Sequence, residues 1–242
     1  MLVKTKAIVL NSLKYGESQV IVDLFTLSHG RLSFVQRIPR TGRGGVKKQL
    51  FQPLTLLAIV FDYRATQKLQ RISEAQIDSP FVSLPFDAFK LSIALFVAEF
   101  TSYATRSEQQ SESLFLFIQN SVLWLDACSR DFANFHIVYM LHLTRFVGFF
   151  PNLDGDDSDK PYFDLRGGCF ARHVPVHGDY LEPRESAIIR LLMRLNYTTM
   201  RLLRLSREER NRIVEVIVNY YRLHQPDFPE MKSLPVLREL FG

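Results

Sequence analysis

The chain has 242 residues, of which 47% are hydrophobic, so it is long enough to bury a substantial core and is not a disordered tail. Its formal charge is +5, and all of the excess lies in residues 1–79, which hold 12 Lys and Arg against 5 Asp and Glu, whereas residues 80–242 hold 18 against 20. This asymmetry favours an N-terminal module that binds polyanions over a uniformly basic surface.

The composition also bears on the compartment. Two cysteines, Cys128 and Cys169, are too few for a disulfide framework and fit a reducing environment. The N-terminal MLVKTKAIVL lacks the apolar core of a signal peptide, and the uncharged run at 113–125, among the longest, has only 13 residues, too few to cross a bilayer. We therefore expect a soluble, cytoplasmic protein with no membrane association.

Residues 1–79 are expected to form five short strands. Alternating or β-rich runs occur in VKTKAIVL, QVIVDLFT, RLSFVQRI, LTLLAIVFDY and LQRISEAQID, at residues 3–10, 19–26, 31–38, 54–63 and 69–78. Gly30 stands where a tight hairpin needs a positive φ. Five antiparallel strands in about eighty residues are typical of a Greek-key barrel of the OB type, whose groove commonly holds single-stranded nucleic acid.

After Pro80 the apolar spacing changes to three and four residues, which predicts helices within 85–106, 112–128 and 132–150. Residues 151–182 are rich in Pro and Gly and are expected to form an irregular loop region. Helices resume at Pro183, and SREE at 206–209 is a capping box. The predicted class is α+β, with an OB-type barrel in residues 1–79 and a helical domain in 80–242 that the loop region interrupts.

The basic stretch RLSFVQRIPRTGRGGVKK at residues 31–48 carries the strongest functional signal. No acidic residue lies between Asp23 and Asp62, and RTGRGGVKK packs four cations and three glycines into nine residues. Such a loop suits phosphates and does not read base edges, although a solvated basic loop is the alternative. The predicted nucleic-acid-binding residues are Lys4, Lys6, Arg31, Arg37, Arg40, Arg43, Lys47 and Lys48.

Three aromatic residues near this stretch, Tyr15, Phe34 and Phe51, are candidates for stacking on bases. The alternating position of Phe34 favours a place in the core instead. His136 and His142, on a strongly apolar helix, are interpreted as core or boundary residues.

An acidic cluster, LDGDDSDK, holds Asp154, Asp156, Asp157 and Asp159. Read as a calcium loop from Asp154 it fails, because its sixth position is Asp159 instead of Gly and its twelfth is Leu165 instead of Glu. A solvated loop is the favoured interpretation.

Cys169, His173 and His177 are spaced four apart, but no second Cys pair completes a zinc site. The chain also lacks a Walker A sequence, GxSxG, HExxH and a dinucleotide fingerprint. We therefore expect no metal, no cofactor and no enzymatic activity.

Several longer stretches resemble one family. YGES (15–18), LFTLSHGRLS (24–33) and LFQPLTLL (50–57) resemble the N-terminal half of RecO, the bacterial recombination mediator, and FVGFFPNLD (146–154) and YFDLRGGCF (162–170) resemble that family's helix end and following loop. The resemblance covers nearly the whole chain. It implies an N-terminal OB-fold that binds single- and double-stranded DNA at the nucleoid, followed by a helical domain.

The resemblance also implies strand annealing, work with RecR, and binding to the C-terminal tail of single-stranded-DNA-binding protein, so that a RecA-type recombinase can load. Many family members carry a four-cysteine zinc motif where this chain has residues 151–173, and here Cys169 alone remains. The loop region is therefore expected to be a degenerate, zinc-ribbon-like insertion.

The tail in question is acidic and ends in Phe, so its receptor needs an apolar pocket beside a cation, which the family places in the helical domain. The candidate cations are Arg130, Arg145, Arg201 and Arg204. An OB-fold RNA-binding protein of translation or ribosome assembly, and a metal-dependent nuclease using residues 154–159, are the alternative hypotheses.

Overall fold

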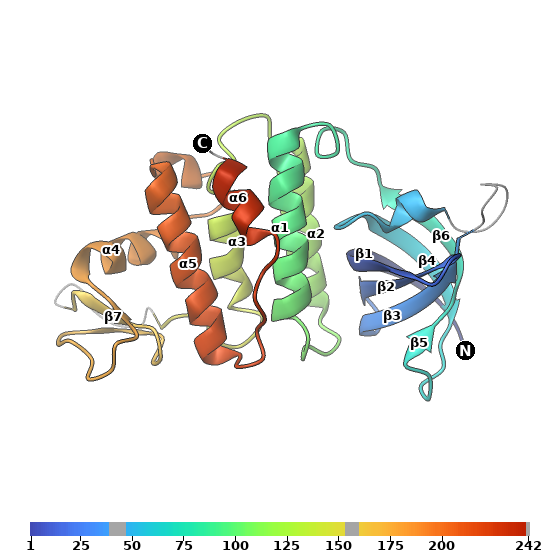
Figure 1. Ribbon diagram of the computed structural model, residues 1–242, viewed down its shortest axis with the longest axis horizontal. Helices are drawn as coiled ribbons and strands as arrows, with labels where there is room; N and C mark the ends of the chain where they lie inside the picture. Colours follow the sequence, from blue (N-terminus) through green and yellow to red (C-terminus); the bar gives the residue numbers. More distant parts are fainter. Residues whose placement is uncertain (39–46, 153–159, 241–242) are drawn as a thin grey trace. The chain divides into compact units, whose positions relative to one another are not determined.

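The computed structural model describes residues 1–38, 47–152 and 160–240 of the chain. These residues belong to two compact units, Met1–Ala127 and Cys128–Gly242. The first unit contains a curled sheet and two helices, and the second contains helices and a small sheet (Figure 1). The predicted α+β class is confirmed. Within the described ranges, no helix has the length and apolar character needed to span a membrane.

The first unit is built on a six-stranded sheet. Its strands are β1 (Leu2–Tyr15), β2 (Gln19–Thr26), β3 (Gly30–Arg37), β4 (Leu56–Asp62), β5 (Leu69–Gln70) and β6 (Ile72–Ser79), in the order β5-β3-β2-β1-β4-β6. β5 and β6 stand at opposite ends of this order, yet only Arg71 separates them along the chain. The sheet must therefore curl to bring β5 and the first residues of β6 together, which gives the predicted OB-type architecture (Figure 1).

One predicted strand, over residues 69–78, is divided in the structure. Leu69–Gln70 pairs with β3, whereas Ile72–Ser79 pairs with β4. The buried Gln70 side chain explains the break, because its Nε2 donates to the carbonyls of Arg64 (2.9 Å) and Gln67 (2.6 Å). A buried amide that binds the preceding loop leaves no trace in an alternating pattern, so five predicted strands become six.

The concave face of the sheet forms the core. Its buried residues include Val3, Ala7, Val9, Val20, Val22, Leu24, Phe34, Leu57, Ile59, Phe61 and Ile72, together with Phe51 from the short helix η1 (Lys48–Phe51). The rings of Phe34 and Phe61 meet edge to face with centroids 5.1 Å apart. Phe34 is a core residue, as its alternating position predicts.

Helices α1 (Ala88–Ala104) and α2 (Glu112–Ala127) lie side by side, and α1 packs on β1 (Figure 1). The predicted hairpin glycine, Gly30, has φ +63°, and a Cβ there would lie 2.8 Å from the backbone nitrogen of Gln110. Only glycine permits both the turn and this close approach. The domain boundary expected between residues 79 and 80 lies inside the first compact unit, Met1–Ala127.

A buried carboxylate fixes the segment between β6 and α1. Asp126, near the end of α2, accepts the N–H groups of Val82 (2.9 Å), Ser83 (2.9 Å) and Leu84 (2.7 Å). Buried Lys90 donates to the Asp126 carbonyl (2.9 Å) and to Ser83 Oγ (2.6 Å). Burial raises the pKa of Asp126, but the three amides and the Lys90 charge outweigh it and hold the pKa below its usual value. We call Ser83, Lys90 and Asp126 the Asp126 latch.

The second unit packs its helices on α3 (Phe135–Leu143), which contacts both α4 (Pro183–Leu192) and α5 (Arg207–His224). The predicted capping box is confirmed, since the Ser206 side chain accepts the Glu209 N–H and the Glu209 carboxylate accepts the Ser206 N–H. Short η2 (Met200–Leu202) lies between α4 and α5, and α6 (Leu234–Leu240) follows α5. The helix predicted within 132–150 is shorter than expected, and turns follow Leu143.

The predicted loop region at 151–182 contains a three-stranded sheet. Its strands are β7 (Tyr162–Asp164), β8 (Cys169–Ala171) and β9 (Tyr180–Leu181), in the order β8-β7-β9. Phe163 packs against Phe170 with centroids 4.9 Å apart, and the Arg190 guanidinium lies 4.2 Å from the centre of the Phe170 ring. Strands of two or three residues are too short to produce a readable alternation, so the sequence predicts only turns here.

Acid is expected to destabilise the second unit through His136. Burial, together with the smaller effect of the nearby Arg210 guanidinium, lowers the pKa of this ring to about 3. In the unfolded chain a histidine titrates near 6.5, so it takes up a proton more readily than the folded one. The free energy of unfolding is therefore undiminished above about pH 6.5 and falls by about 1.4 kcal/mol per pH unit toward pH 3. Urea unfolding at pH 7 and pH 5 checks this.

His136→Gln should lose that pH-dependent difference, whereas the exposed His173→Gln should keep it. A His136→Gln protein with the wild-type pH dependence would show that other groups cause the acid sensitivity.

Candidate nucleic-acid interface

The eight predicted basic residues do not share one surface. Arg31 lies against α1, Lys4 and Lys6 lie on the outer face of β1 beside β4 and β6, and Arg37, Lys47 and Lys48 are exposed where β3 ends and η1 begins. Arg40 and Arg43 lie outside the described residues. Each group offers a different environment to an anion.

Arg31 is engaged within the first unit. Its side chain is 18% exposed and donates to the backbone carbonyl of Ser102, to Ser102 Oγ (3.2 Å) and to the Asp23 carboxylate (3.3 Å). These bonds fasten β3 to α1. The guanidinium would have to leave its partners to reach a phosphate, so Arg31 is a poor candidate for an anion contact.

Lys4 and Lys6 face carboxylates from β6. The strand register places Lys4 beside Val60 and Val60 beside Glu74, so Lys4 and Glu74 lie on one face. Lys6 Nζ pairs with Asp78 at 3.0 Å. Two cations and two carboxylates leave little net charge on this face. It is therefore a weaker phosphate site than its lysines alone suggest.

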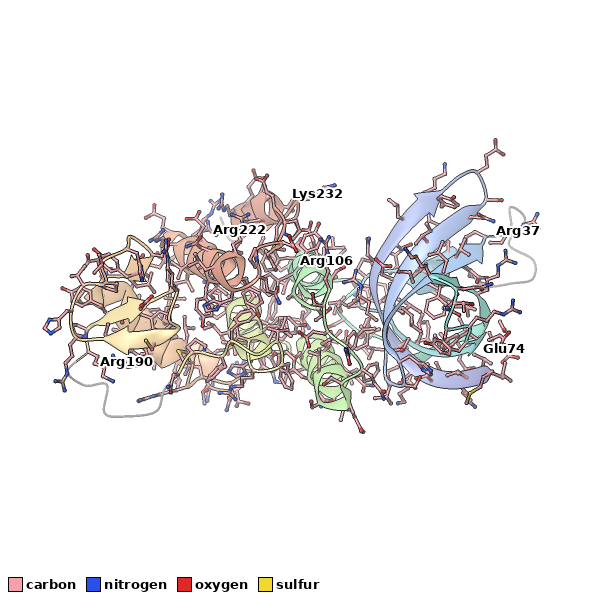
Figure 2. All side chains as sticks on the ribbon, turned by 90° about the horizontal axis from the view of Figure 1, so that it is seen from below. Arg37, Glu74, Arg106, Arg190, Arg222 and Lys232 are labelled. Atoms are coloured by element: carbon pink, nitrogen blue, oxygen red, sulfur yellow. The ribbon has the colours of Figure 1, made fainter. Side chains whose placement is uncertain are left out.

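Arg37 lies at the end of β3 in a very different setting. The register pairs it with Gln19 of β2, and Gln19 with Tyr15 of β1, so the three form one row across the sheet. Tyr15 is 53% exposed, and Figure 2 shows the Arg37 side chain projecting from the sheet, apart from Glu74. The backbone positions of these two exposed residues, Tyr15 and Arg37, are thus about 10 Å apart, two strand spacings.

The adjacent row on the same face is apolar. Leu13 pairs with Ile21, and Ile21 with Val35. Leu13 is 62% exposed, and Ile21 and Val35 are half-buried. We call Leu13, Tyr15, Ile21, Val35 and Arg37 the β1–β3 platform. It combines an apolar surface with a cation, which is the composition that unpaired bases and their phosphates require.

The structure separates the three aromatic stacking candidates. Tyr15 is exposed on the β1–β3 platform, whereas Phe34 and Phe51 are buried in the barrel core. Phe51 is therefore excluded as a stacking residue. Lys47 and Lys48, at the start of η1, are exposed.

The four arginines proposed for the second unit also differ. Arg130 pairs with Asp131 at 3.8 Å, and the Arg145 guanidinium lies 4.3 Å from the centre of the Phe150 ring. Arg201 and Arg204 are exposed and flank Leu202, which is 72% exposed. This last position therefore offers two exposed cations beside one exposed apolar side chain.

Sequence reasoning missed a groove of about 450 Å³ between α4 and α5. Its floor is apolar, and its rim carries Arg184, paired with Glu209 at 3.2 Å, and Arg212, paired with Glu185 at 2.6 Å. Glu208 adds a third rim carboxylate. The rim therefore repels acidic segments, although its floor would suit an apolar side chain.

The small sheet does not supply a zinc site. No cluster of three or more His, Cys, Asp or Glu suited to a metal occurs within the described ranges. His177 Nε2 lies 3.3 Å from the Asp164 carboxylate, which itself accepts the N–H groups of Arg166 (2.8 Å) and Gly167 (3.0 Å). These groups serve the turn between β7 and β8, so the residues described do not fit zinc. The acidic cluster at 154–159 lies outside the described residues.

Comparison with known proteins gives a consistent result over the whole chain. Residues 1–81 match the model of the family "Recombination protein O N terminal", and residues 85–234 match "Recombination protein O C terminal". The chain is similar to proteins named DNA repair protein RecO from Phocaeicola vulgatus (46% identity) and from Bacteroides fragilis ATCC 25285 (48%), over 100% of each chain. A relative of the same name from Flavobacterium psychrophilum is 33% identical, again over 100% of both chains.

Proposed function

Because the chain belongs to the RecO family, we propose that it acts in DNA repair as a non-enzymatic recombination mediator. In this role it binds single- and double-stranded DNA, anneals complementary strands, and helps a RecA-type recombinase to load onto coated single strands. The observation that carries the proposal is the β1–β3 platform, which brings exposed apolar and aromatic side chains beside Arg37, where the basic stretch leaves the sheet.

We assign the phosphate contacts to Arg37, Lys47 and Lys48, which form no ion pair with a carboxylate among the described residues, and to Arg40 and Arg43, which lie outside them. Arg37, Lys47 and Lys48 are exposed, and Arg40 and Arg43 lie in the sequence between them. Lys4 and Lys6 would contribute less, because Glu74 and Asp78 share their face. Arg31 is omitted, since its bonds to Ser102 and Asp23 hold the unit together.

Annealing needs no covalent chemistry. Two strands approach when cations lower the repulsion between their phosphates, and they pair when their bases stay free. Weak, sequence-independent electrostatic binding beside a stacking surface meets both conditions. A grip that read base edges would instead favour particular sequences and slow the exchange of partners.

Tyr15→Ala is expected to weaken binding of single-stranded DNA by about 1–3 kcal/mol and to leave duplex affinity nearly unchanged, because bases in a duplex are already stacked. Fluorescence anisotropy with a mixed-sequence strand and its duplex, at one salt concentration, measures both. Phe86→Ala, at an aromatic residue 84% exposed elsewhere in the first unit, is the matched control and should change neither. Equal losses of affinity for single-stranded and duplex DNA would contradict a stacking role for Tyr15.

We also propose RecR and the tail of single-stranded-DNA-binding protein as partners. The tail is placed at Arg201, Leu202 and Arg204, where two exposed cations flank an exposed apolar residue. The α4–α5 groove is a weaker choice because of its three glutamates. Arg130 and Arg145 already have an ion-pair partner and a ring partner, respectively.

Replacing both Arg201 and Arg204 with Ala should weaken binding of a synthetic tail peptide by up to about thirtyfold, since each exposed charge contact contributes up to about 1 kcal/mol. Arg130→Ala is the control and should bind as the wild type does. Titration calorimetry on the full chain gives both affinities. If the double variant binds normally and Arg130→Ala does not, the tail site lies elsewhere in the second unit.

A further inference from the structure

A second groove, in the first unit, lies next to the proposed DNA surface, because exposed Lys47 and Lys48 directly precede Gln49 in its wall. It has a volume of about 420 Å³ and lies between β6, α1 and the segment that precedes β4. Its lining is formed by Gln49, Gln52, Pro53, Thr55, Ile77, Ser79, Pro80, Phe81, Leu84, Pro85, Leu91, Ala94 and Leu95. We call it the β6–α1 groove.

The groove and its surroundings expose large apolar side chains. Ile77 of β6 is 48% exposed, and Leu91 and Leu95, one turn apart on α1, are 39% and 43% exposed. Val82 and Phe86, which adjoin the lining residues Phe81 and Pro85 in the sequence, are 82% and 84% exposed. A cluster of this kind on one surface is more typical of an interaction site than of a solvated face.

The segment that carries Val82 is held in place by hydrogen bonds. The Asp126 latch uses a carboxylate and an ammonium group, both nearly excluded from water, to fix residues 82–84. Burying two charged groups costs free energy. Here the bond from the Val82 N–H to Asp126 fixes the backbone while the Val82 side chain stays exposed. A surface so fixed is already ordered for a partner and loses little conformational entropy on binding.

The strand beside the groove is suited to an extended partner. β6 is at one end of the sheet order and pairs with β4 alone among the strands described. An edge strand offers backbone N–H and C=O groups to an added strand. Ile77 and Ser79, near the end of β6, also line the groove. An extended partner segment could therefore pair with the backbone of β6 and insert apolar side chains into the groove at the same place.

The charges near the groove further restrict the kind of partner segment that it would bind. Among the described residues, no acidic one lines the groove, and exposed Lys47 and Lys48 directly precede Gln49 in its wall. The nearby carboxylates are engaged: Asp78 pairs with Lys6 at 3.0 Å, and Asp87 accepts the N–H groups at the start of α1. An acidic segment thus meets two cations without opposing charge at the groove itself.

We propose that the β6–α1 groove binds an extended segment of a partner protein, in which apolar side chains enter the groove and acidic side chains face Lys47 and Lys48. This site is separate from the Arg201–Arg204 site proposed for a chain terminus. An internal segment with no free carboxyl end fits the β6–α1 groove, because backbone pairing along β6 does not require one.

Selection from a library of internal peptides of about nine residues, displayed with both ends blocked by flanking sequence, tests the proposal on the full chain. Peptides that also bind the Leu91→Glu/Leu95→Glu variant are removed. The enriched peptides should alternate apolar residues and carry acidic ones. Chosen peptides, made synthetically with amidated ends, should bind the Lys47→Glu/Lys48→Glu variant about tenfold or more weakly. Lys68→Glu and Leu116→Glu, exposed positions elsewhere in the unit, should bind as the wild type does.

The structural readout is hydrogen exchange. A bound peptide should slow exchange of the β6 amides and leave β2 unchanged. Because Leu91 and Leu95 are partly exposed, their double variant should keep the wild-type melting temperature; if it does not, Ile77→Thr replaces it as the groove variant. The proposal fails if no peptides are enriched, if basic peptides are enriched, or if peptide affinity survives the lysine and groove variants alike. Loss of DNA binding in any of these variants would bear on the proposed function and not on this site.

Discussion

Replacing Asp126 with Ala is expected to lower the free energy of unfolding of the first unit by about 3–5 kcal/mol, since removing one member of a buried charged group leaves its partners uncompensated. Three backbone N–H groups at residues 82–84 lose their acceptor, and buried Lys90 loses a neighbouring negative charge. Denaturation by urea, followed by circular dichroism at pH 7, measures the change.

Two controls distinguish the loss of the Asp126 latch from a general loss of helix stability. Asp126→Asn keeps one oxygen acceptor, so it should be destabilised less than Asp126→Ala. Asp87→Ala removes the side chain that caps α1 and should cost about 1 kcal/mol. Because the folded pKa of Asp126 lies below its usual 3.8, its contribution is present above that pH and is lost as the pH falls further. A loss below about 1 kcal/mol for Asp126→Ala would mean that the latch is not a principal support of this unit.

Replacing Arg40, Arg43, Lys47 and Lys48 together with Ala should reduce affinity for single-stranded DNA by several hundredfold at about 0.1 M salt. Each phosphate contact releases about 0.7 of a counterion, so the slope of log affinity against log salt should flatten by about 3. Sequence preference should not change, because these cations meet the backbone and not the bases.

The matched control is Lys4→Ala/Lys6→Ala, on the face that Glu74 and Asp78 share, and it should change the slope much less. The melting temperature of the four-residue variant should move only slightly, since Lys47 and Lys48 are exposed. A four-residue variant with the wild-type slope would show that the loop is merely solvated.

Local features of the fold could be predicted because they depend on neighbours in sequence. The Gly30 turn, the Ser206 capping box and the start of α4 at Pro183 are all confirmed. The burial of Phe34 follows from simple alternation. Each of these depends on a few adjacent residues and on backbone preferences that hold in any fold.

The composition of the candidate interface could not be predicted in the same way. Arg31 meets Ser102, which is distant in sequence, and Lys6 meets Asp78, whose strand reaches β4 only after the sheet has curled. The irregularity in β1 between Val9 and Asn11 matters as much. It reverses the alternation, so Leu13 and Tyr15 face outward although odd-numbered residues before it face the core. The β1–β3 platform follows from that irregularity, which the sequence pattern does not reveal.

The central claim is that this chain brings complementary DNA strands together, and a strand-annealing assay tests it most directly. Two complementary labelled strands, bare or coated with single-stranded-DNA-binding protein, are mixed with the full chain, with no nucleotide or added metal. We predict that the wild type accelerates annealing of both forms, and that the four-residue loop variant loses this activity in parallel with its DNA affinity. A wild-type chain that fails to accelerate annealing, while it binds structured RNA as tightly as DNA, would contradict the account and favour an RNA-binding role.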